Sequence, residues 1–457
     1  MKLRTFIAAA TLLSATAAMA EAPKYIFLYI GDGMGMGPVT AAETYNRTIL
    51  GNDKPLTMMQ MPVVGWCMTY SASSPVTDSA AAGTALSTGF KTTNGMLGMK
   101  PDSTLVYSIA RTLQQKGYGI GVATSVAPDD ATPAAFYAHV PYRSQFYDID
   151  CQMAESGYNF IAGCDLRGTE KDGKDTDVLK RFADNNVQIV RGLEGIADMN
   201  ADKVLLLNNR NPYHKNDIGY TIDSIPDVLT LPAITHACLA QLERTSPDKF
   251  FMMIEGGNID HALHANDGGA AVKEVLNFDR ALKIAFDFYR EHPDETLIVV
   301  TADHDTGGLT LGKGKGEGIG NIDYQKVSKE AFDLYCKSLL RSRMIYTWDD
   351  MKQYLAENLG LYSHIDVTPE QDARLKEMFE RTFELRNSPD QKTLYANFNG
   401  FAAQVFDIFN SATGLTFNTV DHSGNPVPVF AVGAGADDFK SFNNNINIPK
   451  SILRALE

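Results

Sequence analysis

The sequence lacks an excess of positive charge, and beyond its first twenty residues it lacks long apolar runs. It has 41 Lys and Arg residues against 55 Asp and Glu residues. This balance argues against a surface for nucleic acids or anionic membranes. No run after residue 20 is long and apolar enough to span a bilayer. The positive charge needed to bind an anionic ligand must therefore be local, from metal ions or a single arginine.

Cysteine is scarce, and no C-x-x-C spacing indicates a thiolate metal site. Cys151 and Cys164 are close enough in sequence to form a disulfide in an oxidising compartment, although buried free thiols are an equally good interpretation. An odd count leaves at least one free thiol in any case. The five cysteines are Cys67, Cys151, Cys164, Cys238 and Cys336.

The N-terminal segment has the features of a secretory signal. Lys2 and Arg4 precede an apolar stretch at 6–18, and residues 18–20 form an A-x-A cleavage site. We expect residues 1–20 to be a signal peptide cleaved after Ala20, with the mature chain periplasmic or secreted. A membrane anchor is the alternative, but the apolar stretch is shorter than the roughly 20 residues that a span needs.

Apolar, β-branched runs alternate with helical patterns along the rest of the chain. Because these runs are almost continuously apolar, both faces of the sheet should be covered. We predict a three-layer α/β/α sandwich with a large, mostly parallel central sheet. The expected strands are 25–30, 119–124, 203–207, 250–254, 297–301 and 428–432. The expected helices are 78–87, 103–116, 146–156, 233–245, 270–290, 327–341, 348–358 and 368–386.

The segment 311–420 differs from its surroundings. It opens with the Gly- and Lys-rich stretch "GKGKGEGIGN" and continues with amphipathic helical patterns. We interpret it as a helical insert within a single domain at 21–457, and we expect none of the metal-binding residues there.

Acidic residues and histidines follow three of the expected strands. Asp32 lies in "GDGMG", Glu255 ends "FFMMIE", and Asp303 and His304 follow "LIVVTA". In parallel α/β sheets, ligands bind beyond the carboxyl ends of the strands. We therefore expect these residues to share a metal site. For Asp32 alone, a capping role in a turn is the alternative.

The stretch "EGGNIDHALH" carries a second group of candidate ligands. On a helix, Asp260 and His264 lie on one face at i and i+4, a spacing that suits one zinc ion. His261 points elsewhere, and we expect it to support the ligands from outside the metal site. Solvated helix charges are the alternative, but the two preceding glycines permit close backbone approach.

Ser79 begins an Ala-rich helix in "TDSAAAGTA", where the backbone N–H groups favour negative charge. A serine is a poor nucleophile unless a base or a metal activates it. The sequence has no G-x-S-x-G elbow, so the catalytic-triad arrangement of serine hydrolases does not apply. A helix cap is the alternative for the pair Asp78 and Ser79.

Three residues of "APDDATPAAFYAHVPYR" complete the set. Asp130 and Thr132 offer oxygen ligands that suit magnesium better than zinc. Arg143 offers a planar fork that matches two phosphate oxygens, although alone it would be read as a surface arginine. His422 in "DHSGN" is a candidate ligand only because Asp260 and His264 need a third ligand.

With these motifs in the same order along the chain, the sequence resembles the alkaline phosphatase family. The resemblance implies hydrolysis of small phosphate monoesters through a phosphoserine, at a site with two Zn²⁺ ions and one Mg²⁺ ion; a homodimer is possible. It implies that Ser79 is the nucleophile, that Arg143 clamps the phosphate and that Asp130 orders magnesium-bound water. The implied ligands are Asp260, His264 and His422 for the first zinc, Asp32, Asp303 and His304 for the second, and Asp32, Thr132 and Glu255 for magnesium.

Other activities of related metallohydrolases remain as alternatives. A sulfatase would need a C/S-x-P-x-R motif, which the sequence lacks. A phosphodiesterase or phosphomutase of the same superfamily remains open. A periplasmic phosphate- or metal-binding protein without turnover is the non-catalytic alternative, and a competent residue at every matched position argues against it.

Overall fold

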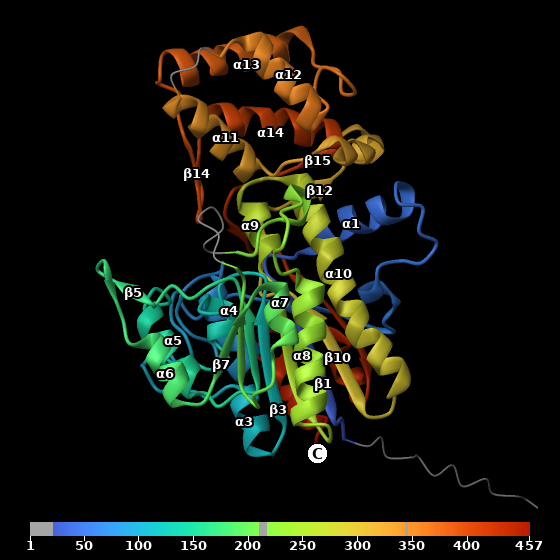
Figure 1. Cartoon of the computed structure of the whole chain (residues 1–457). Helices are drawn as coiled ribbons and strands as arrows, with labels where there is room; N and C mark the ends of the chain where they lie inside the picture. Colours follow the sequence, from blue (N-terminus) through green and yellow to red (C-terminus); the bar gives the residue numbers. More distant parts are fainter. Residues whose placement is uncertain (1–21, 210–216, 343–345) are drawn as a thin grey trace, which may run out of the picture.

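The computed structural model describes residues 22–209, 217–342 and 346–457, so the expected signal peptide lies outside the described residues. A ten-stranded sheet in the order β18-β2-β17-β10-β1-β9-β3-β4-β8-β7 forms its centre (Figure 1). Only β17 runs antiparallel to its neighbours within this sheet. The strands are β1 (Tyr25–Gly31), β2 (Val63–Met68), β3 (Gly119–Thr124), β4 (Phe160–Gly163), β7 (Gln188–Arg191), β8 (Val204–Leu207), β9 (Phe250–Gly256), β10 (Thr296–Thr301), β17 (Val427–Gly433) and β18 (Ser441–Asn444).

Helices cover both faces of the sheet, as the near-continuous apolar strands predict. Successive side chains of a strand point to opposite faces. In β9, Phe250 packs against Phe288 of α10, whereas Phe251 stacks on Phe136 beyond α4. The three-layer α/β/α fold is therefore confirmed. The helices around the sheet are α1 (Met36–Thr48), α2 (Ser79–Thr88), α3 (Ile109–Gln115), α4 (Ala131–Ala134), α5 (Phe146–Glu155), α6 (Val178–Asp184), α7 (Gly192–Ala197), α8 (Leu231–Thr245), α9 (Asn258–His264), α10 (Gly268–Glu291) and α15 (Asn447–Arg454).

The register of the central strands brings their carboxyl ends to one level. Ile30 in β1 is paired with Glu255 in β9 and with Thr301 in β10, and Glu255 is also paired with Thr124 in β3. The loops that follow these strands therefore start at the same edge of the sheet. This edge is where the site is built.

A group of four helices lies beyond that edge, at the top of Figure 1. These helices bury an apolar cluster of their own, centred on Phe332, Leu355 and Phe406 and distinct from the core around the sheet. A short hairpin of β13 (Gln391–Lys392) and β14 (Asn397–Phe398) belongs to the same region. The helices are α11 (Lys329–Arg341), α12 (Trp348–Leu359), α13 (Pro369–Phe379) and α14 (Gly400–Thr413).

All five cysteines are free thiols, so the disulfide considered for Cys151 and Cys164 is absent. Four of the five are buried, and Cys151 is half-buried. Within the described residues, no helix combines the length and the apolar character that a membrane crossing requires.

Candidate active site

Asp32, Asp303 and His304 converge where β1 and β10 end. His304 Nε2 lies 3.4 Å from Asp32 Oδ1 and 3.1 Å from Asp303 Oδ2. The ligand atoms of the three buried side chains all lie within 4.8 Å of one another. The other oxygen of Asp303 accepts backbone hydrogen bonds from Gly33, at 3.1 Å, and from His304, at 2.9 Å, which fixes the carboxylate.

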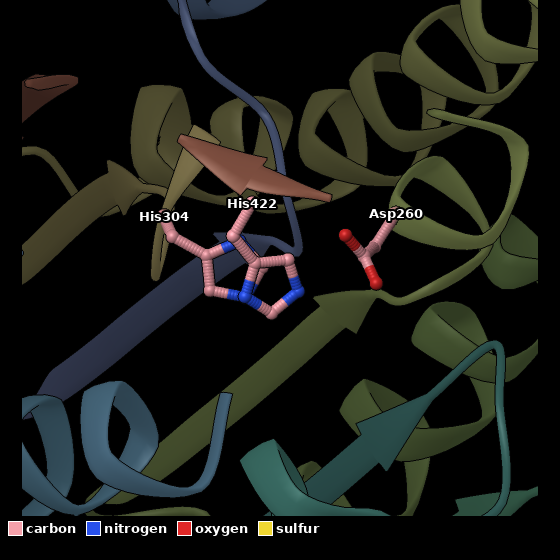
Figure 2. Close-up of side chains that lie close together, drawn as sticks. All are labelled: Asp260, His304 and His422. Carbon is pink, nitrogen blue, oxygen red and sulfur yellow. The ribbon is translucent and has the colours of Figure 1, made fainter. Parts of the chain in front are cut away.

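A second group adjoins the first and shares His304 with it. Asp260, His304 and His422 also place one ligand atom each within 4.8 Å of the others. Figure 2 shows the Asp260 carboxylate facing the two imidazoles, whose rings stack at a centroid distance of 3.7 Å. His264, also expected at this site, places Nε2 3.3 Å from Asp260 Oδ2.

Hydrogen bonds at Nδ1 orient three imidazoles so that Nε2 faces the site. The carbonyl of Val420 lies 2.5 Å from His264 Nδ1, and that of Thr77 lies 2.8 Å from His422 Nδ1. A carbonyl only accepts, so Nδ1 carries the proton and a neutral ring keeps the Nε2 lone pair free. Such carbonyl partners are typical of metal-binding histidines.

Thr306 gives His304 the same orientation. Its hydroxyl donates to Asp260 Oδ1 and lies 3.1 Å from His304 Nδ1.

The site is also tight around Gly33, which adopts φ of 68°, and a Cβ there would lie 2.6 Å from Asp260 Oδ1. Only glycine combines this backbone conformation with this closeness.

A short ladder brings His422 to the site although it lies far away in sequence. In β11 (Asp305–Thr306) and β16 (His422–Ser423), Asp305 pairs with Ser423 and Thr306 pairs with His422. Asp305 also accepts a hydrogen bond from the Ser423 hydroxyl. Asp305 thus holds the segment of His422 rather than joining the cluster, consistent with its omission from the expected ligands.

The cluster leaves buried ligand atoms unsatisfied. Buried polar atoms are normally hydrogen-bonded, so a group of such exceptions at one place calls for a partner. The atoms that form no hydrogen bond with the described residues are Asp32 Oδ1, Asp260 Oδ2, Asp303 Oδ2, His264 Nε2 and His422 Nε2. Carboxylate oxygens and imidazole nitrogens in this arrangement fit divalent metal ions such as zinc.

Charge repulsion among the buried carboxylates also indicates a site for cations. Burial, followed by the charges of Asp303, Asp260 and Glu255, raises the pKa of Asp32 well above its usual range. Burial and the charge of Asp260 raise the pKa of Asp303 to about 7. Bound cations would remove this penalty and favour the ionised carboxylates.

Glu255 lies beside these ligands at the end of β9. Its carboxylate accepts a hydrogen bond from the Thr124 hydroxyl. Burial raises its pKa to about 8, with Asp130 and Asp303 adding to the shift and the hydroxyls of Thr124 and Thr132 opposing it. Thr132 is buried in α4, next to Asp130, so Glu255, Thr132 and Asp130, all expected around magnesium, lie in one region.

Ser79 is the first residue of α2 and is 1 % exposed. Its Oγ lies 3.2 Å from His304 Nε2, so the hydroxyl faces the ligand cluster. Asp78 is the cap of this helix and accepts from the Ala81 N–H, which leaves Ser79 free of the capping role. The helix N-terminus favours negative charge on the serine oxygen.

Arg143 is held beside Ser79 by two carboxylates. Its Nη2 donates to Asp130 Oδ1 at 2.8 Å, and its Nη1 lies 3.5 Å from Asp78 Oδ2. Both carboxylates raise the pKa of Arg143 against the effect of burial, so the guanidinium stays charged. The residue is part of the site and not an isolated surface arginine.

A cavity of about 620 Å³ opens in front of these residues. Asp78, Arg143, His264 and His422 line it together with Arg167, Phe146, Leu394 and Tyr395. Its size is typical of a site for a small ligand.

Several residues of this cavity have no counterpart in the expected site, and Tyr395 and Arg167 contact the residues that do. Tyr395, at the tip of the β13–β14 hairpin, packs over His261 at a centroid distance of 4.1 Å and over His264 at 5.2 Å. The segment 311–420 therefore supplies a residue to the site, although none of the expected ligands. Arg167 follows β4 and contacts Asp130. No motif marks either residue, because both reach the site only through tertiary packing.

Comparison with known proteins places this geometry in a family. The family model for alkaline phosphatase matches residues 23–179 and 161–457. The chain is 28% identical to alkaline phosphatase 4 of Bacillus subtilis, over 94% of this chain and 88% of that protein. It is 30% identical to the repressible alkaline phosphatase of Saccharomyces cerevisiae, over 64% of this chain and 56% of that protein.

Solved structures agree with the sequence comparisons. The cold-active alkaline phosphatase of Shewanella sp. superposes with a TM-score of 0.79 at 26% identity, covering 94% of this chain and 99% of that chain. A mutant of the alkaline phosphatase from the Antarctic bacterium TAB5, with Mg bound in its M3 site, has a TM-score of 0.65 at 25% identity over 96% of this chain and 99% of that chain.

The fold is thus that of the alkaline phosphatases, and the buried cluster offers side chains that could hold metal ions. The chain belongs to the alkaline phosphatase family. It is an enzyme of that class, a hydrolase of phosphate monoesters.

Proposed function

We propose that the protein hydrolyses phosphate monoesters through a phosphoserine intermediate on Ser79, at a site for two zinc ions and one magnesium ion. The observation that carries the proposal is the contact between Ser79 Oγ and His304 Nε2, 3.2 Å apart within a cluster of unsatisfied ligand atoms. A nucleophile at the edge of a multi-metal cluster is the arrangement that phosphoryl transfer requires.

The donor set supports an assignment of the ions. Zinc accepts mixed oxygen and nitrogen ligands, whereas magnesium prefers oxygen alone. In this proposal Asp260, His264 and His422 hold one zinc, and Asp32, Asp303 and His304 hold the other. Asp32, Thr132 and Glu255 hold magnesium, and Asp130 orders its water. His261, under the ring of Tyr395, supports this region from outside.

The protein's own residues position the reaction. Bound cations would supply Lewis-acid stabilisation for the charge on the attacking and leaving oxygens. Ser79 Oγ loses its proton, attacks phosphorus in line and forms a phosphate ester with the protein, while the P–O bond to the leaving group breaks and the alcohol departs with a proton. Water then attacks the phosphoserine, which releases inorganic phosphate and restores the Ser79 hydroxyl. Arg143 donates from its two terminal nitrogens to two phosphoryl oxygens, because Asp78 and Asp130 hold the guanidinium in place.

We also propose that the protein acts after export to the periplasm or the exterior, which the basic and apolar N-terminal sequence supports. The segment 311–420 serves as a helical cap over the cavity, through Leu394 and Tyr395. A homodimer stays a prediction.

The test is an assay of purified protein with 4-nitrophenyl phosphate at alkaline pH, in parallel with bis(4-nitrophenyl) phosphate and 4-nitrophenyl sulfate. We expect turnover of the monoester that is lost after EDTA treatment and restored by Zn²⁺ with Mg²⁺. Preference for the diester or the sulfate would replace the proposed substrate class. No turnover of any ester by fully metallated protein would favour a binding function.

A further inference from the structure

We propose that Arg167 is a second anion-binding residue, which selects phosphate monoesters whose leaving group carries another anionic group, a carboxylate or a phosphoryl group. This inference rests on the proposed function, because it concerns the leaving group of the same reaction. Arg167 lies in "GCDLRG", outside every motif that marks the site. It lines the cavity that Arg143 and Asp78 also line.

The guanidinium of Arg167 is fixed in place before any ligand binds. Asp129, which is fully buried, accepts from Arg167 Nε at 2.7 Å and from the Arg167 backbone N–H at 2.6 Å. Below the guanidinium lies the ring of Phe146, at 4.0 Å from the ring centroid to Cζ. A charged group that is already ordered loses little entropy when it binds an anion.

Arg167 and Arg143 are neighbours through one carboxylate. Asp130 Oδ1 accepts from Arg143 at 2.8 Å, and Asp130 Oδ2 lies 3.2 Å from Arg167 Nη1. Anions bound by the two arginines would therefore sit side by side. The side chains are also equally accessible, at 24% exposure for Arg143 and 21% for Arg167.

Arg167 keeps binding capacity that the protein does not use. Its Nη2 is buried and has no hydrogen-bond partner among the described residues. An unpaired donor on a charged group is costly, so the guanidinium is left short of acceptors. Because Nη2 itself is buried, an anionic ligand would meet Arg167 through the part of the side chain that lines the cavity. The cavity of about 620 Å³ has room for a leaving group beside the phosphoryl group.

A purely structural role is the competing explanation. Arg167 could serve only to hold Asp130, and through it Arg143. Loss of Arg167 would then weaken all ligands to the same degree. If Arg167 is a second anion-binding residue, its loss must instead weaken the binding of ligands with an additional negative charge more than the binding of matched ligands without one.

The experiment uses hydrolysis-resistant ligands, so that its result does not depend on turnover. The ligands are benzylphosphonates with a carboxylate at the ortho, meta or para position, each compared with its own methyl ester. Their dissociation constants are measured by calorimetry on the metal-loaded wild type, Arg167→Met and Arg181→Met, with the zinc and magnesium contents determined for each. Arg181 is a surface arginine paired with Asp177 and Glu155, so its loss controls for net charge.

We expect the wild type to bind at least one acid on the order of tenfold more tightly than its ester, as one charge-assisted contact allows. Arg167→Met should lose this preference and Arg181→Met should keep it. The absence of a preference in the wild type, its persistence in Arg167→Met, or an equal loss for acid and ester would each overturn the proposal. Failure of the proposed function would show separately, as no hydrolysis of 4-nitrophenyl phosphate by a wild type that still discriminates acid from ester.

Discussion

Thr306 and His422 are paired residues of the β11–β16 ladder, and this pairing lays the His422 ring against that of His304. The Thr306 hydroxyl also donates to Asp260 and contacts His304 Nδ1. One threonine thus organises three of the proposed zinc ligands without being a ligand itself.

Replacing Thr306 by valine should therefore weaken zinc binding while leaving the fold intact. Loss of a hydrogen bond that orients a ligand typically lowers metal affinity about 10- to 100-fold. Competition with a zinc chelator would measure the change. Thr306→Ser keeps the hydroxyl and should retain most of the affinity. Equal zinc affinity in Thr306→Val and the wild type would show that the hydroxyl does not orient the ligands.

Removal of Arg143 should impair catalysis and phosphate binding together. Its guanidinium is held by Asp78 and Asp130 at the position where two phosphoryl oxygens would bind. Arg143→Ala should lower kcat/KM for 4-nitrophenyl phosphate about 100- to 1000-fold, as loss of a preorganised donor does. Product inhibition by inorganic phosphate should weaken as well. Arg111→Ala, at an exposed arginine, is the control, and an unchanged phosphate inhibition constant in Arg143→Ala would remove Arg143 from the site.

Tyr395 should contribute to binding of aromatic leaving groups. Its ring packs on His261 and His264, and with Leu394 it forms an apolar part of the cavity wall. Tyr395→Ala should raise KM for 4-nitrophenyl phosphate about three- to tenfold, the usual value of an aromatic contact, and change KM for glycerol 2-phosphate less. Tyr395→Phe keeps the ring and should behave as the wild type. Equal effects of Tyr395→Ala on both substrates would argue against a contact with the leaving group.

Glu274, away from the metal cluster, should make stability depend on pH. Burial raises its pKa to about 7, and Asp217 adds to the shift, against opposing hydrogen bonds from Thr221 and the charge of Arg280. The folded protein then holds a proton that the unfolded chain releases near its ordinary pKa. This contribution to stability is complete below the unfolded pKa and is lost as pH rises to about 7.

Glu274→Gln keeps an acceptor for the Thr221 N–H without a charge. Relative to the wild type, the variant should gain stability between pH 5 and 8 by up to about 3 kcal/mol. Thermal unfolding of both proteins across this range would measure the difference. A constant difference in melting temperature would mean that Glu274 does not titrate in this window.

The main strands could be predicted because their apolar runs are continuous. All six expected strands are present, and most of their ends lie within one residue of the expected positions. The four further strands carry weaker signals. In β2 (Val63–Met68) buried and exposed residues alternate around Gly65, and β18 (Ser441–Asn444) is a polar edge strand. Strands β4 and β7 contain only two large apolar residues each, whereas the equally short β8 contains four.

Helix ends were predicted less well where turn chemistry intervenes. The helix expected at 103–116 begins only at Ile109, with Ser108 as its cap. Ser103 has a positive φ of 67°, and Leu105 forms a bridge with Met99, so the first part is a turn and a bridge. Helix α1 was not predicted, because its buried positions mix Pro, Ala and Asn with Val and Tyr and form no clear apolar pattern.

In the candidate site, too, residues in strongly patterned segments could be predicted, whereas residues placed by tertiary packing could not. Asp32, Glu255 and Asp303 could be located because each lies at or just beyond the end of a strand, and the register brings these ends together. Tyr395 and Arg167 could not, because their place depends on how a hairpin and a loop pack against the sheet. Sequence motifs mark the ligands of such a site better than the walls around them.

The most direct test of the account is to trap the covalent intermediate. The metal-loaded wild type is mixed with a phosphate monoester, quenched in acid and digested, and the peptides are mapped by mass spectrometry. We predict a phosphoserine at Ser79 in the wild type. Ser79→Ala should show no phosphorylated residue and at least about a thousandfold lower turnover. Turnover by the wild type without phosphate on Ser79, or phosphate on another residue, would contradict the account.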